Sequence, residues 1–259
     1  MITDSSPRTA TVSSLWRHPV KSMQGQRVDD VNFDSLGVVG DRAYGVLNRE
    51  SGTILSAKRE GRLLEAAAEY RSGVLVVTLP SGEEFHQGTQ LDDEVSSWLG
   101  YPVALVIAAT FGVATFESPE DFERDDSQVV SWEGTGDRFV DESALHLLTS
   151  SELERLSRER PELNWDVRRF RPNIVVDDGE GELDTSPQRI IHVGEIVIEI
   201  TKPCSRCVMT TRPQPGGLDR QLDVLRHVSR HHDGNVGTRA TVVRSGVVRE
   251  GDEVRTREP

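Results

Sequence analysis

Two thiols and a guanidinium stand close together in the segment 201–217, whose sequence is T-K-P-C-S-R-C-V-M-T-T-R-P-Q-P-G-G. Cys204 and Cys207 are the two cysteines of the chain, and Ser205 and Arg206 lie between them. A thiol beside an arginine is biased towards the thiolate, which is the form that binds metals and attacks electrophiles. This segment is therefore the first candidate for chemistry in the sequence.

The C-x-x-C spacing has four interpretations. It is compatible with half of a zinc site, a dithiol redox pair, a soft metal ligand with a helper, or two inert small hydrophobic residues. Zinc needs about two more ligands, and the obvious ones, His231 and His232, are adjacent, so their side chains diverge. A redox pair normally opens a helix, which V-M-T-T-R-P cannot continue. A thiolate that ligates a heavier metal beside a phosphate-bearing organic cofactor would use both the thiol and nearby arginines.

Groups that suit an oxyanion occur at several predicted strand ends and loops, where binding residues are often mounted. They are Lys21 with Ser22, Arg42, Arg171 with Asn173, and Ser205 with Arg206. A guanidinium with serine hydroxyls and backbone N–H groups is a general phosphate cradle, although any single arginine is more often a solvated surface group. Arg171 has the strongest local argument. The run R-R-F-R-P-N crowds three cations beside a predicted buried strand, which costs free energy unless an anion is present.

Composition limits the function classes. The 259 residues carry a net charge of −13, which disfavours nucleic acid and anionic membranes as partners, since both require a cationic surface. The sequence has no long apolar run and no signal-peptide pattern, so we expect no membrane association. Two cysteines three positions apart cannot form a disulfide framework, which fits a reducing compartment and predicts a cytoplasmic protein.

The N-terminal part is dense in short predicted strands and glycine turns, which suggests an all-β barrel or sandwich. The expected strands cover 9–16, 28–33, 43–47, 53–56, 64–70, 74–79, 83–86 and 102–109. Apolar residues at helical spacing predict one helix over 91–99, ended by Gly100. The polar and acidic stretch 116–138 is expected to be a linker or flap.

The C-terminal part combines strands with short helices, so the fold class is mainly β with a few short helices (α+β). The expected elements are a short apolar run at 144–148, a helix over 153–160 after the capping box T-S-S-E, a strand at 174–176, a hairpin of 188–193 and 195–200, a short helix around 218–225, and a closing hairpin over 240–254. Pro203 cannot donate a ladder hydrogen bond, so pairing should fail there and leave the cysteines in a loop.

Five motifs occur in a fixed order along the chain: H-P-V-K-S, G-D-R-x-[YFW], F-R-P-N-[IV], C-x-R-C and a closing G-x-[VI]-x-x-G-D-x-V. With these motifs the sequence resembles the MOSC superfamily with its N-terminal β-barrel domain, and within it the mitochondrial amidoxime reducing component and its bacterial relatives. The resemblance extends from about Ser13 to Arg255. It implies an N-terminal β-barrel domain over 9–115, the linker or flap at 116–138, and a MOSC β-barrel domain over 139–257.

The resemblance also implies a molybdenum cofactor, a molybdopterin that binds between the two domains. Cys207 matches the family's molybdenum ligand and, with Asp141, the catalytic positions. The implied cofactor-binding residues are Lys21, Ser22, Arg42, Ser143, Arg171, Asn173, Ser205, Arg206 and Cys207. Cys204 would either pack in the interior or tune the site, and a structural role is favoured over ligation. The chain departs from the family where N-V-G-T-R-A places Arg239 at a position expected to contact the cofactor.

The implied activity is that of a molybdenum-dependent oxidoreductase that reduces N-hydroxylated substrates. No cysteines follow the C-x-R-C motif, so the electrons are expected from a separate ferredoxin- or cytochrome-type donor and its reductase. One alternative is a carrier of sulfur for the cofactor, with a persulfide on Cys207 or Cys204. That reading is weakened because no pyridoxal-phosphate domain is recognisable. The other alternative is a cofactor-binding module without reductase activity.

Overall fold

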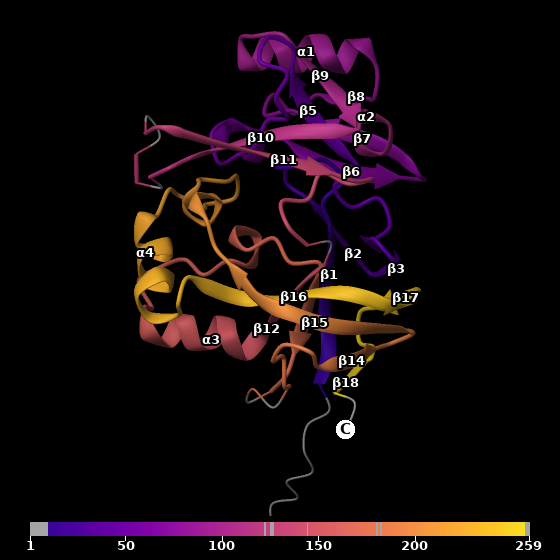
Figure 1. The fold of residues 1–259 in the computed structure, drawn as a ribbon, viewed down its shortest axis with the longest axis vertical. Coiled ribbons are helices and arrows are strands. Elements are labelled where there is room, and N and C mark those ends of the chain that lie inside the picture. Colours follow the sequence, from indigo (N-terminus) through magenta and orange to yellow (C-terminus); the bar gives the residue numbers. More distant parts are fainter. Residues whose placement is uncertain are drawn as a thin grey trace, which may run out of the picture.

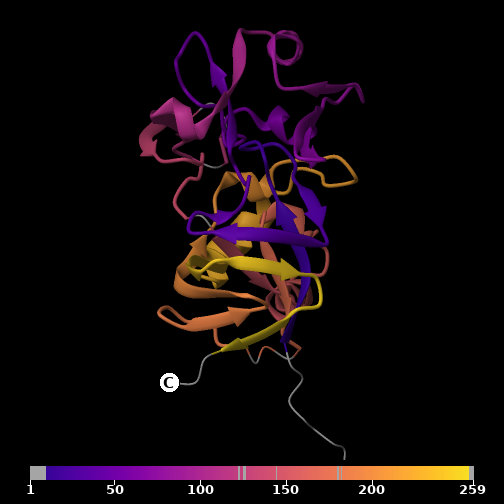
Figure 2. The same cartoon turned by 90° about the vertical axis from the view of Figure 1, so that its right-hand side faces the viewer.

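The computed structural model describes residues 10–121, 123–124, 127–143, 145–179, 181 and 183–256. Two lobes are stacked along its long axis (Figures 1 and 2). The upper lobe in Figure 1 comes from the N-terminal part of the chain, and the lower lobe is a β-barrel flanked by two helices. This architecture confirms the predicted fold class. Within the described residues, every helix is too short or too polar to serve as a membrane span.

Seven strands close the lower barrel, because β1 pairs with both β18 and β13. In order around the ring they are β13 (Ile174–Asp177), β12 (Leu145–Thr149), β16 (Asn235–Arg244), β15 (Ile196–Ser205), β14 (Ile190–Val193), β18 (Glu253–Thr256) and β1 (Ala10–Arg17). Apolar residues on these strands, such as Leu15, Ile174 and Ile198, are fully buried and form one cluster inside the ring. The first strand of the chain therefore belongs to the same barrel as the last. Ala144, in the predicted apolar run, lies outside the described residues.

Two amphipathic helices, α3 (Ser150–Glu159) and α4 (Leu222–His231), pack beside the barrel. Half of the predicted capping box is present, since the Thr149 hydroxyl accepts a hydrogen bond from the backbone N–H of Glu152, whereas the Glu152 carboxylate accepts from the N–H of Gly237. Trp165 and Phe170 stack in the apolar cluster that these helices share with the barrel. Two short 3-10 turns, η2 (Val167–Arg169) and η3 (Val208–Thr211), lie next to this cluster.

The upper lobe has its own core of apolar side chains. Its elements are β5 (Tyr44–Asn48), η1 (Gly61–Glu65), β6 (Ala67–Arg71), β7 (Val74–Thr78), β8 (Glu84–His86), α1 (Thr89–Leu99), β9 (Val103–Ile107) and α2 (Ala108–Phe111). Gly100 caps α1 in the left-handed conformation with φ of 82°, as the sequence predicted. The strand β2 (Gln26–Val28) pairs with β1 at the edge of the barrel sheet. The strands β17 (Gly246–Arg249), β3 (Asp30–Asp34) and β4 (Gly37–Val38) form a separate small sheet, whose buried apolar side chains join the core of the lower barrel.

The acidic stretch expected as a linker or flap is largely a hairpin of β10 (Val113–Pro119) and β11 (Val129–Thr135). It runs between the upper lobe and the helices of the lower lobe (Figure 1). Phe116 and Trp132 face each other across its strands, and Phe116 is only 2% exposed. Near the tip, Glu123 accepts hydrogen bonds of 2.7 and 2.9 Å from Arg226 of α4. Regular pairing and an aromatic anchor therefore order this segment despite its polar composition.

The prediction that pairing fails at Pro203 is wrong. The strand β15 continues to Ser205, and Pro203 lies opposite Thr238 of β16. Register shifts on both sides of this pair let the ladder skip the missing N–H donor. Cys204 therefore belongs to a strand, and only Cys207 lies beyond its end.

The expected closing hairpin is also wrong, because β17 and β18 have different partners. The strand β17 pairs with β3, while β18 fills the position between β14 and β1 that closes the barrel. Two other predicted strands in the N-terminal part also differ. The predicted strand at 28–33 is divided between β2 and β3, and the predicted strand at 53–56 is only a single β-bridge at Ile54. In each case the available neighbour, and not the local sequence, decides the pairing.

A buried arginine fastens the loop that follows the cysteines. Arg169 is 1% exposed, and its guanidinium donates hydrogen bonds to the backbone carbonyls of Asn164, Thr210, Arg212 and Asp219 at 2.9 to 3.3 Å. The neighbouring Arg168 is half-buried, pairs with Asp166 and donates a 2.9 Å hydrogen bond to the carbonyl of Pro215. The two adjacent arginines therefore differ in burial, since Arg169 is enclosed by backbone carbonyls and Arg168 remains partly open to solvent.

We expect Arg169→Met to lower the free energy of unfolding by about 3 kcal/mol or more, because several buried carbonyls lose a charged donor. The matched control Arg168→Met should cost less, about 1 kcal/mol, because its pair with Asp166 is partly exposed to solvent and it donates to fewer buried carbonyls. Urea denaturation followed by circular dichroism measures both. Equal losses in the two variants would contradict the assignment of Arg169 as a structural fastener.

Candidate functional site

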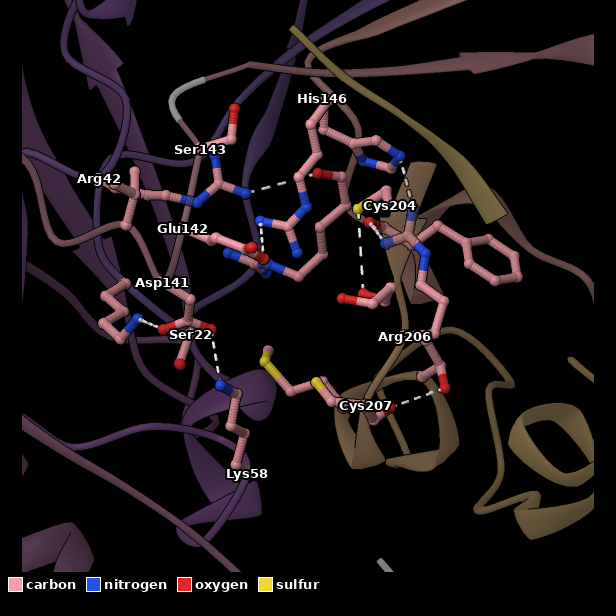
Figure 3. Close-up of a pocket in the computed structure, with 18 of the residues that line it drawn as sticks. Ser22, Arg42, Lys58, Asp141, Glu142, Ser143, His146, Cys204, Arg206 and Cys207 are labelled. Atoms are coloured by element: carbon pink, nitrogen blue, oxygen red, sulfur yellow. Dashed lines mark hydrogen bonds and ion pairs between the residues drawn. The ribbon is translucent and has the colours of Figure 1, made fainter. Parts of the chain in front are cut away.

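A cavity of about 460 Å³ is lined by residues from both lobes. Figure 3 shows that its wall combines side chains from the N-terminal ribbon with others from the C-terminal ribbon. All ten residues predicted as site residues line it: Lys21, Ser22, Arg42, Asp141, Ser143, Arg171, Asn173, Ser205, Arg206 and Cys207. Side chains more than a hundred positions apart in the sequence therefore meet in one place.

Three of these residues have a left-handed backbone. The φ angles of Ser22, Arg42 and Arg171 are 68°, 51° and 54°, and only six described residues other than glycine have a positive φ. This conformation costs a residue with a Cβ about 1 kcal/mol or more, so the surrounding contacts must impose it. The backbone N–H of Arg42, for example, donates a 2.7 Å hydrogen bond to the carbonyl of His18. Strain of this kind concentrates at functional sites, which supports a role for this wall of the cavity.

Asp41 holds this strained turn in place through contacts with His18 and Arg42. It is completely buried, accepts a 2.6 Å hydrogen bond from the backbone N–H of His18, and pairs with Arg42. Burial alone would raise the pKa of Asp41, but the Arg42 charge and the contacts with His18 outweigh it and hold the pKa well below its ordinary value. Asp41 is therefore an ionised internal partner that fixes the position of Arg42 at the cavity wall.

Asp141 joins two lysines across the cavity (Figure 3). Its carboxylate pairs with Lys21 and lies 2.8 Å from Nζ of Lys58, while one third of its side chain remains exposed. Burial favours a raised pKa, but the two ammonium groups dominate and hold the pKa of Asp141 well below its ordinary value. The two ammonium groups also lie over the rings of Phe116 and Trp132 at 4.5 and 4.3 Å, so the hairpin β10–β11 covers them.

Arg171 has an unused donor. Its Nη1 donates a 2.7 Å hydrogen bond to the carbonyl of Met23, whereas its Nη2 is buried without a partner among the described residues. Burial, together with the charge of nearby Arg42, lowers the pKa of Arg171 to about 9 despite Asp41 and Asp141. An anion in the cavity would supply both the missing acceptor and the missing charge.

The crowding of three cations in R-R-F-R-P-N is resolved differently from what the sequence suggested. Arg168 pairs with Asp166, and Arg169 is satisfied by backbone carbonyls. Only Arg171 of the three retains a buried donor without a partner in the described part of the chain. The argument for an anion therefore rests on one arginine and not on the cluster.

Arg206 also lines the cavity, but protein groups occupy its guanidinium. Nε donates to the carbonyl of Val236 at 2.8 Å, Nη1 donates to the carbonyl of Phe170 at 2.9 Å, and Nη2 contacts His146. Its backbone N–H donates to the carbonyl of Gly234 at 2.8 Å. Arg206 is therefore better suited to holding the cysteine loop in place than to binding a ligand.

His146 is the buried partner in this arrangement. Burial lowers the pKa of His146 well below its ordinary value, and the charge of Arg206 adds to this effect, so the imidazole is neutral. Gly237 packs closely behind it with φ of 71°, and a Cβ at this position would lie 2.7 Å from the carbonyl oxygen of Leu147. A glycine is therefore required here by both its conformation and the available space.

The two cysteines have different environments, and both are free thiols. Cys204 is 6% exposed and buried at the end of β15. Cys207 is half-buried and projects from the C-terminal side of the cavity in the direction of Lys58 (Figure 3). Cys207 is therefore the more accessible of the two to a cavity ligand.

Two predicted binding residues are used mainly by the framework. The Asn173 side chain donates to the carbonyl of Trp16 and accepts from the N–H of His146, which ties three barrel strands together. The Ser143 hydroxyl donates to the carbonyl of Ala240 at 3.2 Å. Both line the cavity, but these hydrogen bonds join them to backbone groups of the barrel strands.

Several cavity residues were not singled out from the sequence. They are Lys58, Ser118, Trp132, Val140, Glu142, Leu145, His146, Arg169, Phe170, Met209 and Thr210. One signal was present: the chain has only three lysines among 30 basic residues, and all three pair with the adjacent acids Asp141 and Glu142. Arg239, whose role was doubtful, pairs with Glu142 at 2.8 Å, and its buried Nε has no partner among the described residues.

Comparison with known families agrees with this arrangement. The model of the MOSC N-terminal beta barrel domain matches residues 9–101, and the model of the MOSC domain matches residues 135–255. The chain belongs to the MOSC family. In this MOSC protein, however, β1 lies within the first match and completes the barrel formed by the second. The two matched regions are therefore interleaved in space.

Three relatives illustrate the similarity. Mitochondrial amidoxime reducing component 2 of Rattus norvegicus is 26% identical over 254 residues, which cover 85% of this chain and 72% of that protein. Mitochondrial amidoxime-reducing component 1 of Homo sapiens is 24% identical over 249 residues, with the same two coverages of 85% and 72%. Molybdenum cofactor sulfurase of Drosophila grimshawi is 30% identical over 156 residues, which cover 58% of this chain and 18% of that protein.

We expect one thiol of the folded protein to react rapidly with a thiol-specific reagent such as dithionitrobenzoate. Cys207 should supply it, because it is half-buried beside a cavity, whereas Cys204 is 6% exposed. Cys207→Ser should therefore lose the fast phase, and the matched control Cys204→Ser should keep it. Loss of the fast phase in Cys204→Ser alone would reverse the assignment.

Acid should destabilise the protein through Asp41 and Asp141. Both have a folded-state pKa below the unfolded value of about 3.9, so their stabilising effect is complete above about pH 4 and is lost as the pH falls towards the folded-state pKa. Urea denaturation at several pH values measures this loss. In Asp41→Asn the acid-dependent loss should be smaller, and the stability at pH 7 should drop by about 3 kcal/mol because Arg42 loses its buried partner. An unchanged pH profile in that variant would contradict the role of Asp41.

Proposed function

We propose that this protein binds a molybdenum cofactor and reduces N-hydroxylated substrates with electrons from a separate donor protein. The family membership and the relatives named as amidoxime reducing components support this proposal. The observation that carries it is an accessible thiol, Cys207, on a cavity whose cationic wall includes the unpartnered Nη2 of Arg171. A soft metal ligand and an anion site in one cavity match a metal-bearing, phosphorylated cofactor.

The residues present fit such a group. The cavity of about 460 Å³ lies within the range of about 300–1,000 Å³ that is usual for cofactor and small-molecule sites. Cys207 would hold the metal through its thiolate. Arg171 and Arg239 each have a buried donor without a partner in the described residues, and these donors would bind anionic or carbonyl oxygens of the cofactor. When bound, the cofactor would supply the oxygen-atom transfer and redox chemistry that the reduction of an N-hydroxylated substrate requires.

The reaction needs protons as well as electrons. Conversion of N–OH to N–H breaks the N–O bond, consumes two electrons and two protons, and releases water. Asp141 is a poor proton donor at neutral pH because its pKa is held low by the two lysines. Burial lowers the pKa of Lys21, although Asp141 opposes this effect. The Lys21 ammonium is therefore the better acid, and we assign to Asp141 the role of holding Lys21 and Lys58 at the cavity.

The remaining parts of the proposal concern partners and location. The donor would be a ferredoxin- or cytochrome-type protein supplied by its own reductase. Two free thiols, both of which line the cavity, are compatible with a reducing compartment, so we propose the cytoplasm.

A second function is favoured by the similarity to a molybdenum cofactor sulfurase. In that case Cys207 would carry a persulfide sulfur for transfer to the cofactor. Mass spectrometry of the purified protein distinguishes the two functions. Labile sulfur on Cys207 without stoichiometric molybdenum would favour the carrier over the reductase.

We expect the protein made in cells that synthesise the molybdenum cofactor to contain about one molybdenum per chain, and none when it is made in cells that lack the cofactor. Cys207→Ser should lose N-reductase activity with a chemical electron donor, because the metal loses its protein ligand. Cys204→Ser is the matched control and should keep most activity. Full molybdenum content and activity in Cys207→Ser would reject the proposal.

We expect Arg171→Gln to weaken retention of the cofactor by about 10- to 100-fold, which corresponds to the loss of a charge-assisted hydrogen bond of about 1.5–3 kcal/mol. Molybdenum content after dialysis, measured against time, reports this effect. The control Arg168→Gln removes a nearby arginine that already pairs with Asp166 and should retain cofactor like the parent protein. Equal retention in both variants would show that Arg171 does not bind the cofactor.

A further inference from the structure

We propose a second metal site, for a divalent transition metal of the zinc class, where the C-terminal ends of α3 and α4 meet. Its ligands are Glu159, His227 and His232. Nε2 of His227 and Nε2 of His232 lie 2.8 and 2.7 Å from the same carboxylate oxygen, Oε2 of Glu159. The candidate ligand atoms of all three residues lie within 4.8 Å of one another. Two imidazoles and one carboxylate form a ligand set that Zn²⁺ prefers.

The three side chains are already held in place. Glu159 is the last residue of α3, and His227 lies on α4, 7% exposed and packed edge-on against the Trp165 ring at 5.7 Å. His232 caps α4, and its backbone N–H donates a hydrogen bond to the carbonyl of Val228. About a third of the Glu159 side chain is exposed, so an ion can enter from solvent. The site is therefore both preformed and accessible.

The local field also favours a cation. Both helices are ten residues long, and both end at this point, α3 at Glu159 and α4 at His231. The C-terminal end of a helix carries a partial negative charge from its unpaired carbonyls. Two such ends and the Glu159 carboxylate together create a negative environment for the two imidazoles. A divalent ion would neutralise this charge more completely than two hydrogen bonds from imidazole rings.

The ion would replace the two hydrogen bonds that now meet at Oε2. Metal–ligand bonds of about 2.0–2.1 Å in tetrahedral geometry place ligand atoms roughly 3.3 Å apart. The present N···O separations of 2.7 and 2.8 Å would therefore widen by about half an ångström, which small side-chain rotations can supply. Each imidazole would carry its remaining proton on Nδ1, and water would complete the coordination.

This site differs from the zinc site considered from the sequence, which combined both cysteines with His231 and His232. Among the described residues, the group whose ligand atoms converge contains no cysteine and includes His227 in place of His231. The ring of His231 lies beside that of His227, with centroids 4.8 Å apart, but it is exposed. A histidine five positions before His232 on the same helix, and not its sequence neighbour, supplies the second imidazole.

The metal would take no part in the reaction in the cavity, but it would stabilise a turn that supports the cavity wall. His232 lies two positions before Gly234, whose carbonyl accepts the 2.8 Å hydrogen bond from the backbone N–H of Arg206. Arg206 directly precedes Cys207. An ion that joins α3 to the end of α4 would therefore steady the turn that supports the cysteine loop.

Titration of Zn²⁺ into the chelator-treated full chain tests the proposal by calorimetry, and Co²⁺ absorption provides a second readout. The tests use the double variant Cys204→Ser/Cys207→Ser beside the parent chain, so that the thiols of the cavity do not contribute. We expect one equivalent of Zn²⁺ in that double variant, and Co²⁺ spectra without a thiolate charge-transfer band. Adding Glu159→Gln or His232→Ala should weaken binding at least tenfold, whereas adding the matched control His231→Ala should leave it unchanged.

Thermal denaturation gives an independent measure. Zn²⁺ should raise the melting temperature of the double variant and of His231→Ala, but not of Glu159→Gln, which keeps the size of the side chain and should remain folded. Three results would each overturn the proposal: no Zn²⁺ binding in the double variant, equal binding in Glu159→Gln, or loss of binding in His231→Ala. None of these outcomes depends on molybdenum content or on reductase activity, so this test is separate from that of the proposed function.

Discussion

Positive charge buried between two lobes is the constraint on which the rest of this structure depends. Lys21, Lys58 and Arg171 are each less than a tenth exposed, and burial lowers the pKa of Lys21 and Arg171. Asp141 compensates the two lysines, but Nη2 of Arg171 has no partner among the described residues. An arrangement of this kind costs stability in the free protein and becomes favourable when an anion enters. The left-handed backbone at Arg171 indicates that the fold imposes this cost locally.

Two other arginines near the cavity have protein partners for their guanidinium groups and support the structure. The guanidinium groups of Arg169 and Arg206 are occupied by protein groups, mostly backbone carbonyls. They connect the cysteine segment to the residues just before β13 and to Val236 at the start of β16. Saturated arginines act as rigid connectors, because a planar fork with several donors fixes several chain segments at once. Arg171 and Arg239, which each keep a buried donor without a partner among the described residues, are thus suited to binding, whereas Arg169 and Arg206 provide support. The accessible thiol of Cys207 depends on the support.

The two lobes cooperate through shared elements. The chain begins in the lower barrel with β1, continues into the upper lobe, and returns through the hairpin β10–β11 (Figure 1). Aromatic rings of this hairpin lie over the ammonium groups of Lys21 and Lys58, while its tip contacts α4 through Glu123 and Arg226. The cavity wall is therefore assembled from both lobes, and its geometry depends on how they are held together.

The sequence alone determined the mainly β class, the N-cap of α3, the glycine stop of α1 and ten of the residues that line the cavity. These features are encoded locally or in short motifs, so neighbouring residues are enough to specify them. Only the tertiary structure decided that β1 closes the barrel, that β17 and β18 separate, and that pairing continues past Pro203, because each depends on which strand is available as a neighbour. It also decided which arginine keeps a free donor and that Lys58 reaches Asp141, since these contacts join residues far apart in the chain. Local sequence specifies the groups, whereas burial and long-range contacts determine which of them remain unsatisfied and therefore able to bind.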